Sequence, residues 1–419
     1  MTAVTQHGAH AARNGQADTS EPTLVPGTGH QGQTFLVGNE VYLRTFQVGD
    51  EKNAASWRNS VFPKSTELMK KWIEEELPKA GKNKQSYYAI VRKSDDVLVG
   101  SVRAGNYETV VELEAHVDPL YGEQGQRWKA EAITLCAAWA VDERHMPSLN
   151  TELPASETIV IEALAAFGMR ECARWREMFF VDGQRVDNVM YSYHNKGWLE
   201  TLGDPMETEL PKSGSGEPRP VPPKVMLEGD PPKNAILVGK RVYLRPEEKA
   251  DAKQVAEWAR KETETFFDVG RHLPTEVLHA NWITSIQDDS HPDTISFSVC
   301  LRENDELIGS VNLFGVDYVN MYAETGSFFH RPDYRGSGYG SEAKHLLLEY
   351  AFDVLGLHMV ESWVYFPNTR SAAALRKQGY KEAGRVTWLY PYEGNFGSMV
   401  VFDLLADEWR AMPRADWDS

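Results

Sequence analysis

The sequence of 419 residues contains little cysteine, with Cys136, Cys172 and Cys300 as its only thiols. They lie far apart and form no CxxC pair, so neither a disulfide framework nor a zinc site is predicted, and no other metal site is indicated. Basic residues are also outnumbered, because 44 Lys and Arg face 61 Asp and Glu, which gives a net charge of −17. A polyanion is repelled by phosphate backbones, so we expect no nucleic-acid partner, whereas a basic amine suits this charge.

Long apolar runs are missing as well. No window offers the roughly 18 uncharged apolar residues of a membrane-spanning helix. The first 15 residues contain no apolar core of a signal peptide. We therefore expect no membrane partner and a cytoplasmic location. The hydrophobic share of 42% is ordinary for a globular protein and excludes a wholly disordered chain.

Composition divides the chain into parts. Residues 1–33 are rich in Gly, His, Gln, Thr and Ala without an apolar period, which predicts a disordered tail. Residues 203–234 hold eight of the 22 prolines, and proline fixes φ and removes donors, so an extended linker is predicted there. The remaining segments, 34–202 and 235–419, are predicted to be two domains of similar size.

The two segments contain related sequences. Residues 35–44 read FLVGNEVYLR and residues 236–245 read ILVGKRVYLR, with seven of ten positions identical at an offset of 201. Residues 98–102 (LVGSV) similarly match residues 307–311 (LIGSV). A repeat of this length indicates a duplicated domain rather than a solenoid.

The second segment alternates between strand and helix patterns. Short β-branched runs separated by polar turns predict strands, and apolar residues at helical spacing predict helices between them. The order predicts an α/β domain with a mixed sheet and flanking helices, which the first segment follows less clearly. The predicted strands are Leu237–Leu244, Ile295–Leu301, Leu307–Phe314, Tyr322–Phe329, Met359–Phe366, Lys381–Tyr390 and Ser398–Leu405.

A glycine-rich loop follows the predicted strand Tyr322–Phe329. It reads Arg335-Gly336-Ser337-Gly338-Tyr339-Gly340 and leads directly into a helix. Consecutive backbone N–H groups and the helix N-terminus make a positively polarised nest for a phosphate, and Arg335 can add a charged contact. No GK[ST] follows and the glycine spacing is not that of a dinucleotide fingerprint, so the loop alone does not name its ligand.

A second motif follows the next predicted strand. Asn368 and Ser371 stand at the start of a short helix, where both could act as caps. The helix ends at Gly379-Tyr380.

Together with the segment 350–385, these motifs resemble the GNAT acyltransferases, and most closely their RimJ/RimL-like, ribosomal-protein N-acetyltransferase branch. The resemblance covers about 236–410 well and about 35–200 weakly. It implies two tandem GNAT-like domains, of which the second binds acyl-CoA and acts as an N-acyltransferase of class EC 2.3.1.

The resemblance also implies a site. Two strands would splay apart so that the pantetheine arm inserts between them, and a backbone N–H near the end of the first strand would polarise the thioester carbonyl. Asn368 would hydrogen-bond the pantetheine arm and Ser371 would lie near the sulfur. The residues expected to bind the cofactor are Phe328, Phe329, His330, Arg335, Gly336, Ser337, Gly338, Tyr339, Gly340, Asn368 and Ser371.

The catalytic groups are less defined. The attacking amine must be neutral, so a base has to remove a proton. Glu324 is the first candidate because it lies on the strand leading to the acyl site, although it could equally be a solvated strand carboxylate. Glu361 on the neighbouring strand is the second. Tyr380 or Ser371 could protonate the departing thiolate, with a core aromatic as the alternative for Tyr380.

The first segment departs from the motif. If Pro119 is aligned with Pro332, then Glu123 takes the place of Gly336 and Arg127 that of Gly340. A carboxylate would then point into the phosphate nest, and no asparagine matches Asn368. We therefore expect a degenerate first domain, or pseudo-domain, that keeps the fold but does not bind CoA.

Three functions remain open. The first is transfer of an acyl group, by default acetyl, from CoA to a small-molecule amine or a protein N-terminus. The second is an acyltransferase of natural-product biosynthesis that takes its acyl group from the phosphopantetheine of an acyl carrier protein. The third is a non-catalytic CoA-sensing or scaffold protein.

Overall fold

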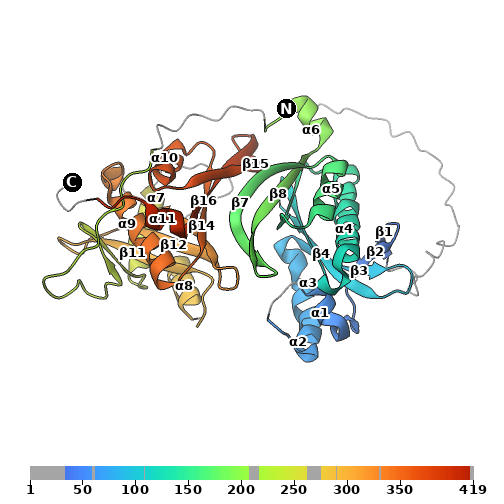
Figure 1. Ribbon diagram of the computed structural model, residues 1–419. Helices are drawn as coiled ribbons and strands as arrows, with labels where there is room; N and C mark the ends of the chain where they lie inside the picture. Colours follow the sequence, from blue (N-terminus) through green and yellow to red (C-terminus); the bar gives the residue numbers. More distant parts are fainter. Residues whose placement is uncertain are drawn as a thin grey trace, which may run out of the picture.

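The computed structural model describes residues 34–58, 62–107, 109–206, 217–261, 275–288, 290–329 and 332–415 (Figure 1). The tail predicted over 1–33 and part of the predicted linker lie outside these residues. Within the described ranges, no helix combines the length and hydrophobicity needed to cross a bilayer.

The first half of the chain contains eight strands and six α-helices within the described residues. The strands are β1 (Thr34–Val37), β2 (Val41–Thr45), β3 (Gln85–Arg92), β4 (Leu98–Asn106), β5 (Val110–Val117), β6 (Ser148–Pro154), β7 (Arg170–Val181) and β8 (Gln184–His194). The helices are α1 (Ala54–Trp57), α2 (Thr66–Lys71), α3 (Leu77–Ala80), α4 (Gly122–Asp142), α5 (Thr158–Phe167) and α6 (Lys196–Leu202).

The second half repeats this order. Its strands are β9 (Leu237–Val238), β10 (Val242–Pro246), β11 (Ile295–Leu301), β12 (Leu307–Asp317), β13 (Tyr322–Phe328), β14 (Met359–Tyr365), β15 (Lys381–Tyr392) and β16 (Asn395–Leu405). Its helices are α7 (Asp251–Lys261), α8 (Glu276–Gln287), α9 (Tyr339–Glu349), α10 (Thr369–Lys377) and α11 (Ala406–Ala411).

All these strands belong to one sheet, in which the two halves have the same strand order. The first half runs β1-β2-β3-β4-β5-β6-β8-β7, and the second half runs β9-β10-β11-β12-β13-β14-β16-β15. The sheet is mixed, since β5–β6 and β13–β14 are parallel and the other neighbours are antiparallel. The α/β fold class with a mixed sheet and flanking helices is thus confirmed (Figure 1).

Each half has its own hydrophobic core between the sheet and its long helices. In the first half, Ile133 of α4 and Val160 of α5 pack with Leu113 of β5, and all three are almost fully buried. In the second half, Leu347 of α9 and Val311 of β12 occupy the corresponding core. The part of the predicted linker that the structure describes contributes as well, because Val221 is buried in this second core.

The halves are joined edge to edge at β7 and β15, where Ala173 pairs with Gly384. Gly384 has a φ of +150°, and a Cβ atom there would lie 2.3 Å from the carbonyl oxygen of Cys172. Only glycine allows the two backbones to approach this closely.

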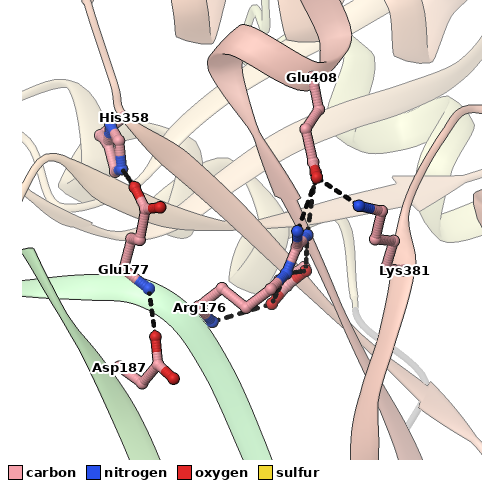
Figure 2. A network of polar contacts seen from close by, with 7 residues as sticks. Arg176, Glu177, Asp187, His358, Lys381 and Glu408 are labelled. Atoms are coloured by element: carbon pink, nitrogen blue, oxygen red, sulfur yellow. Dashed lines mark hydrogen bonds and ion pairs between the residues drawn. The ribbon is translucent and has the colours of Figure 1, made fainter.

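An arginine of the first half strengthens this junction (Figure 2). Arg176 of β7 donates to Asp403 of β16 through Nη2 at 2.5 Å and to Glu408 of α11 through Nη1 at 2.7 Å. Lys381 also pairs with Glu408, and these bonds lower the pKa of Glu408 to about 2 despite its partial burial. Beside them, His358 of the second half hydrogen-bonds Glu177 of the first at 2.8 Å.

Two details differ from the sequence predictions. The single strand predicted over Leu237–Leu244 is wrong, because the chain reverses there and β9 pairs antiparallel with β10. The ungapped alignment that runs from Pro119 and Pro332 into the helix is also wrong, as the carboxylates of Glu131 and Glu342 show. Each accepts backbone N–H groups from the turn between the first two strands of its half, so these two glutamates correspond.

This correspondence places Trp128 opposite Tyr339, the first residue of α9. Helix α4 begins six residues earlier, at Gly122, so a helical segment stands where the second half has its glycine loop. Glu123 is an exposed residue of that helix 3.8 Å from Arg127. It does not point into a phosphate nest, because no such nest is formed there.

Candidate active site

The two central parallel strands of the second half separate after a short contact. Strands β13 and β14 pair at only three positions, ending at Glu324 opposite Glu361. Just beyond, Thr325 Oγ1 donates to the carbonyl oxygen of Glu361 at 3.0 Å, and Ser362 Oγ donates to that of Thr325 at 3.0 Å. We call this point of separation, bounded by Thr325 and Ser362, the notch.

The glycine loop lies between the end of β13 and the start of α9. Gly336 and Gly338 have φ values of +77° and +89°, a conformation that side chains with a Cβ rarely adopt. Gly338 is the N-cap of α9, and no side chain caps the helix, so its first N–H groups face the loop. Arg335 Nε donates to the carbonyl oxygen of Phe329 at 2.7 Å and holds the loop against the strand end.

Arg241 adds a cation to this loop. Its Nη1 donates to the carbonyl oxygen of Ser337 at 2.9 Å, its Nε pairs with Glu342 at 2.9 Å, and its guanidinium lies 4.4 Å from the centroid of the Tyr339 ring. The side chain remains 42% exposed. Sequence reasoning missed this residue because it precedes Glu342 by 101 positions, although the repeat contains a signal: the matching position of the first half is Glu40.

Three polar side chains meet under the notch. The hydroxyl of Tyr380 lies 2.8 Å from Thr325 Oγ1, and burial raises the pKa of Tyr380 above its usual range. Lys344 of α9 is 3% exposed, and its Nζ lies 5.8 Å from the centroid of the Tyr380 ring. Among the residues that the structure describes, Lys344 makes no hydrogen bond, and burial lowers its pKa to about 7 against the opposing charge of Glu324.

A buried ammonium without a partner is expensive, so Lys344 is unusual for a structural residue. The sequence did not predict the role of Lys344, because a single lysine in a helix is normally expected to face solvent. The signal was again in the repeat, since the matching residue of α4 is Ile133.

The two candidate bases lie side by side at the last paired position of β13 and β14. Burial raises the pKa of Glu324, partly offset by the charge of Lys344. Glu361 is only 8% exposed, and burial together with the nearby carboxylates of Glu152 and Glu324 raises its pKa far more. Trp363 Nε1 donates to Glu361 at 3.1 Å. Burial thus disfavours the charged form of Glu361 more strongly than that of Glu324.

Asn368 begins α10 as its N-cap. Its Oδ1 accepts from the backbone N–H of Ser371 at 3.1 Å, so the capping interpretation is confirmed for Asn368. Ser371 lies in the first turn of the same helix and is half-buried.

The other residues expected at the acyl end lie along the end of β13. Phe328 is 50% exposed, whereas Phe329 packs on the core beside Gly340, whose Cβ position would lie 3.3 Å from the Phe329 ring. His330 lies outside the described residues. The structure therefore brings the loop, the notch and the start of α10 to the same end of the sheet, with Glu324 at the base of the notch.

The first half has the same splay but different side chains. Strands β5 and β6 pair at four positions and then separate. The second half has the polar residues Thr325, Lys344 and Tyr380 below the splay. The first half has buried apolar side chains at the three matching positions. These are Leu113, Ile133 and Met169.

An ion pair crosses the corresponding groove of the first half. Lys129 of α4 lies 2.7 Å from Glu157, the N-cap residue of α5, and both side chains are largely buried. These positions correspond to Gly340 and Asn368 in the second half. Glu40, the counterpart of Arg241, meanwhile accepts from Trp128 Nε1 at 2.8 Å. The first half therefore lacks the cation beside the loop and has its groove bridged.

Comparison with known proteins relates part of the chain to a protein family. Residues 241–381 match the acetyltransferase (GNAT) domain family. The chain therefore contains a GNAT acetyltransferase domain over residues 241–381. The chain is 29% identical over 176 residues to the uncharacterized N-acetyltransferase p20 of Bacillus licheniformis, which covers 41% of this chain and 97% of that protein.

One further sequence and one solved structure are also similar to part of the chain. The uncharacterized N-acetyltransferase YnaD of Bacillus subtilis is 26% identical over 174 residues, covering 41% of this chain and 98% of YnaD. A spermidine N-acetyltransferase of Vibrio cholerae, solved in complex with CoA and spermine, aligns with 40% of this chain and 98% of its own at 18% identity and a TM-score of 0.37. The GNAT domain and its N-acetyltransferase relatives make the chain an acyltransferase of class EC 2.3.1.

Proposed function

We propose that the second half transfers an acyl group, by default acetyl, from acyl-CoA to an amine. The observation that carries this proposal is the notch between β13 and β14, with an uncapped helix start and two flexible glycines at one side and three polar side chains beneath it. Phosphates favour a helix N-terminus with a neighbouring cation, which Arg241 supplies, and an extended pantetheine arm fits where two strands leave each other unpaired. Loop residues 335–340 and Asn368 would hold the donor.

The side chains around the notch supply the proton transfers. Glu324 would take a proton from the amine as its nitrogen attacks the thioester carbonyl carbon. As the C–S bond breaks, the thiolate would receive a proton from Tyr380, and the positive charge of Lys344 would stabilise the sulfur anion. Ser371 would contact the sulfur side from the first turn of α10. Neither a carrier-protein donor nor a non-catalytic role has a comparable observation in its support.

We further propose that the chain arose by duplication within the RimJ/RimL-like branch and that the first half is a degenerate copy. The repeated strand order and the shared turn-capping glutamates support the duplication. The boundaries 34–202 and 235–419 fit it, with 203–234 between them. Because the three cysteines are buried and unpaired, a reducing cytoplasm suits the chain.

Calorimetric titration with CoA tests the donor site. We expect one site per chain, because the first half has its groove bridged and Glu40 in place of Arg241. Arg241→Glu should weaken CoA binding about tenfold or more, since it removes one charged contact and adds a repulsive one. Lys129→Gln, at the first-half groove, should leave the affinity unchanged. Two equivalent sites would contradict the proposal.

Lys344→Met is expected to stabilise the protein while slowing transfer at least tenfold. Burial lowers the pKa of Lys344 to about 7, whereas an unfolded lysine titrates near about 10.4, so the unfolded chain binds the extra proton between these values. The wild-type free energy of unfolding therefore rises with pH in this window, by up to about 1.4 kcal/mol per unit.

The methionine variant lacks this slope, so its advantage is largest below pH 7 and disappears above about pH 10. Urea unfolding at pH 6 and pH 9.5, alongside the exposed-site control Lys253→Met, measures the difference. An advantage that does not change with pH would contradict a buried, titrating Lys344.

A further inference from the structure

Two buried polar atoms of the second half have no hydrogen-bond partner among the described residues, and they face each other. They are Oε2 of Glu247 and Nε2 of His279, which lie 3.9 Å apart. Glu247, directly after β10, is 3% exposed, and the His279 side chain on α8 is 15% exposed and stacked on Trp282. The separation is too long for a direct hydrogen bond but suits a donor placed about 2.8 Å from each.

The repeat shows what these positions hold when they serve packing alone. The first half places the same Arg–Asp ion pair at the end of its second strand, with Arg44–Asp50 matching Arg245–Asp251. Counting from this pair, Phe46 corresponds to Glu247. Counting from the N-caps Ser65 of α2 and Thr275 of α8, Met69 corresponds to His279.

Phe46 and Met69 are both buried in an apolar cluster with Trp57. The second half therefore has an acid and a base at two packing positions, and one atom of each has no hydrogen-bond partner among the described residues. Burial also raises the pKa of Glu247 to about 7, and the charge of Asp251 adds to this rise while Ser296 and Arg245 oppose it. Buried polar atoms without hydrogen-bond partners destabilise the folded protein. A bound ligand that supplies the missing hydrogen bonds would explain why they are present.

The first half indicates where such a pair would lie relative to a cavity. In the first half, a cavity between α1, the helical segment that includes Trp72, and strands β3–β5 is lined by Phe46, Trp57, Trp72, Tyr87, Arg103 and Glu114, among others. Strand register matches Tyr87, Arg103 and Glu114 with Ser296, Asn312 and Gly326. By this correspondence, an acceptor cleft of the second half would be bordered by Glu247 at one end and would reach β13 at Gly326, two residues beyond Glu324.

A polar row connects the two ends of this cleft. The Ser296 hydroxyl bonds Asn312 and is a hydrogen-bond neighbour of Glu247. Ser296 and Asn312 are both buried and lie opposite each other on β11 and β12, with Gly326 next on β13. Glu247 directly follows β10, and three strand spacings of about 4.8 Å separate β10 from β13, so Glu247 lies roughly 14 Å from β13.

We propose that Glu247 and His279 form a second ammonium site of the acceptor cleft, so that the preferred acceptor carries a protonated nitrogen roughly 14 Å from the amine that is acylated. The Glu247 carboxylate accepts hydrogen bonds, and so does His279 Nε2 in the tautomer that carries its proton on Nδ1, so an occupant that donates to both completes the pair. A primary ammonium does so and places its charge against the carboxylate. This inference rests on the proposed amine acyltransferase activity and narrows its substrate to diamines and related polycations.

The test compares kcat/KM for a series of linear α,ω-diamines with the monoamines of equal chain length, using acetyl-CoA as donor. For wild type we expect a preference of about tenfold or more for diamines whose nitrogens lie roughly 14 Å apart, the value of one charged hydrogen-bonded contact. Glu247→Gln should reduce this preference to about twofold or less while leaving the monoamine rates and the KM for acetyl-CoA unchanged. His279→Gln should weaken it in the same direction.

Glu114→Gln, in the first-half cavity, is the matched control and should leave the diamine preference intact. Equal rates for the two series in wild type would mean that only a buried water bridges Glu247 and His279, which overturns the inference while the transferase activity stands. Equal losses with monoamines and diamines in Glu247→Gln would also overturn it. If no amine of either series is acylated although acetyl-CoA binds, the proposed function itself fails, and this inference fails with it.

Discussion

Glu324→Gln is expected to lower kcat by at least about 100-fold while changing the affinity for acetyl-CoA by less than about twofold. Glu324 is the last residue of β13 that pairs with β14, so its carboxylate lies where the strands open. Glutamine keeps the size and the hydrogen-bonding capacity of the side chain but cannot accept a proton. A general base contributes only to the chemical step, so donor binding should be unaffected. Steady-state kinetics with a reactive diamine and calorimetry with CoA separate the two quantities.

The pH profile gives an independent readout. Burial raises the pKa of Glu324 above its ordinary value, so the wild-type activity should fall as pH drops through this raised pKa and the carboxylate becomes protonated. The glutamine variant should lose this acid limb. An unchanged kcat for Glu324→Gln, with its acid limb retained, would eliminate Glu324 as the base.

Two matched variants support the assignment. Glu112 occupies the same register in the first half, opposite Asn150 where Glu324 is opposite Glu361, so Glu112→Gln should leave kcat within about twofold. Glu361→Gln should also have a small effect, because burial and neighbouring carboxylates raise the pKa of Glu361 and disfavour the charged form that a base needs. A loss in Glu361→Gln as large as in Glu324→Gln would move the base to the neighbouring strand.

Much of the fold and part of the candidate site could be predicted from local sequence patterns. Sequence patterns predicted the glycine loop, the N-cap Asn368 and the order of the strands. Each of these features depends on neighbouring residues or on a short period. The mixed sheet followed from that order. Local patterns did not predict Arg241 or Lys344. Arg241 pairs with Glu342, which lies 101 residues later in the chain, and Lys344 is buried although lysines are usually exposed to solvent. Both differ in charge or polarity from their counterparts in the repeat, Glu40 and Ile133, which is the comparison that could have found them.

The misplaced alignment of the first half has a physical reason too. Pro119 and Pro332 both precede a helix, but only helix register shows that α4 starts six residues ahead of the position matching the start of α9. Composition does not reveal whether a glycine-containing segment is a loop or the first turns of a helix. The capping contacts of Glu131 and Glu342 do, because they fix each helix against the same turn of its half.

Installing the first-half bridge in the second half should abolish donor binding. We expect the double variant Gly340→Lys with Asn368→Glu to weaken CoA binding by at least about 100-fold, as measured by calorimetry. In the first half, Lys129 and Glu157 meet at 2.7 Å between the starts of α4 and α5, where the second half has only a glycine and an amide. The added pair is neutral overall, so a loss of affinity would come from the occupied groove rather than from altered charge.

Single substitutions separate these contributions. Gly340→Lys alone adds a cation near the phosphate loop and should weaken binding less than the pair, because the unpaired side chain can leave the groove. The Cβ atom at residue 340 meets only the Phe329 ring, at 3.3 Å, so the fold should tolerate it and thermal unfolding should change little. The reverse change, Lys129→Gly with Glu157→Asn, should create no new site, since Glu40 and the helical start of α4 remain. An affinity within threefold of wild type for the installed pair would mean that the donor does not pass between Gly340 and Asn368, and that the notch is not its path to the acceptor.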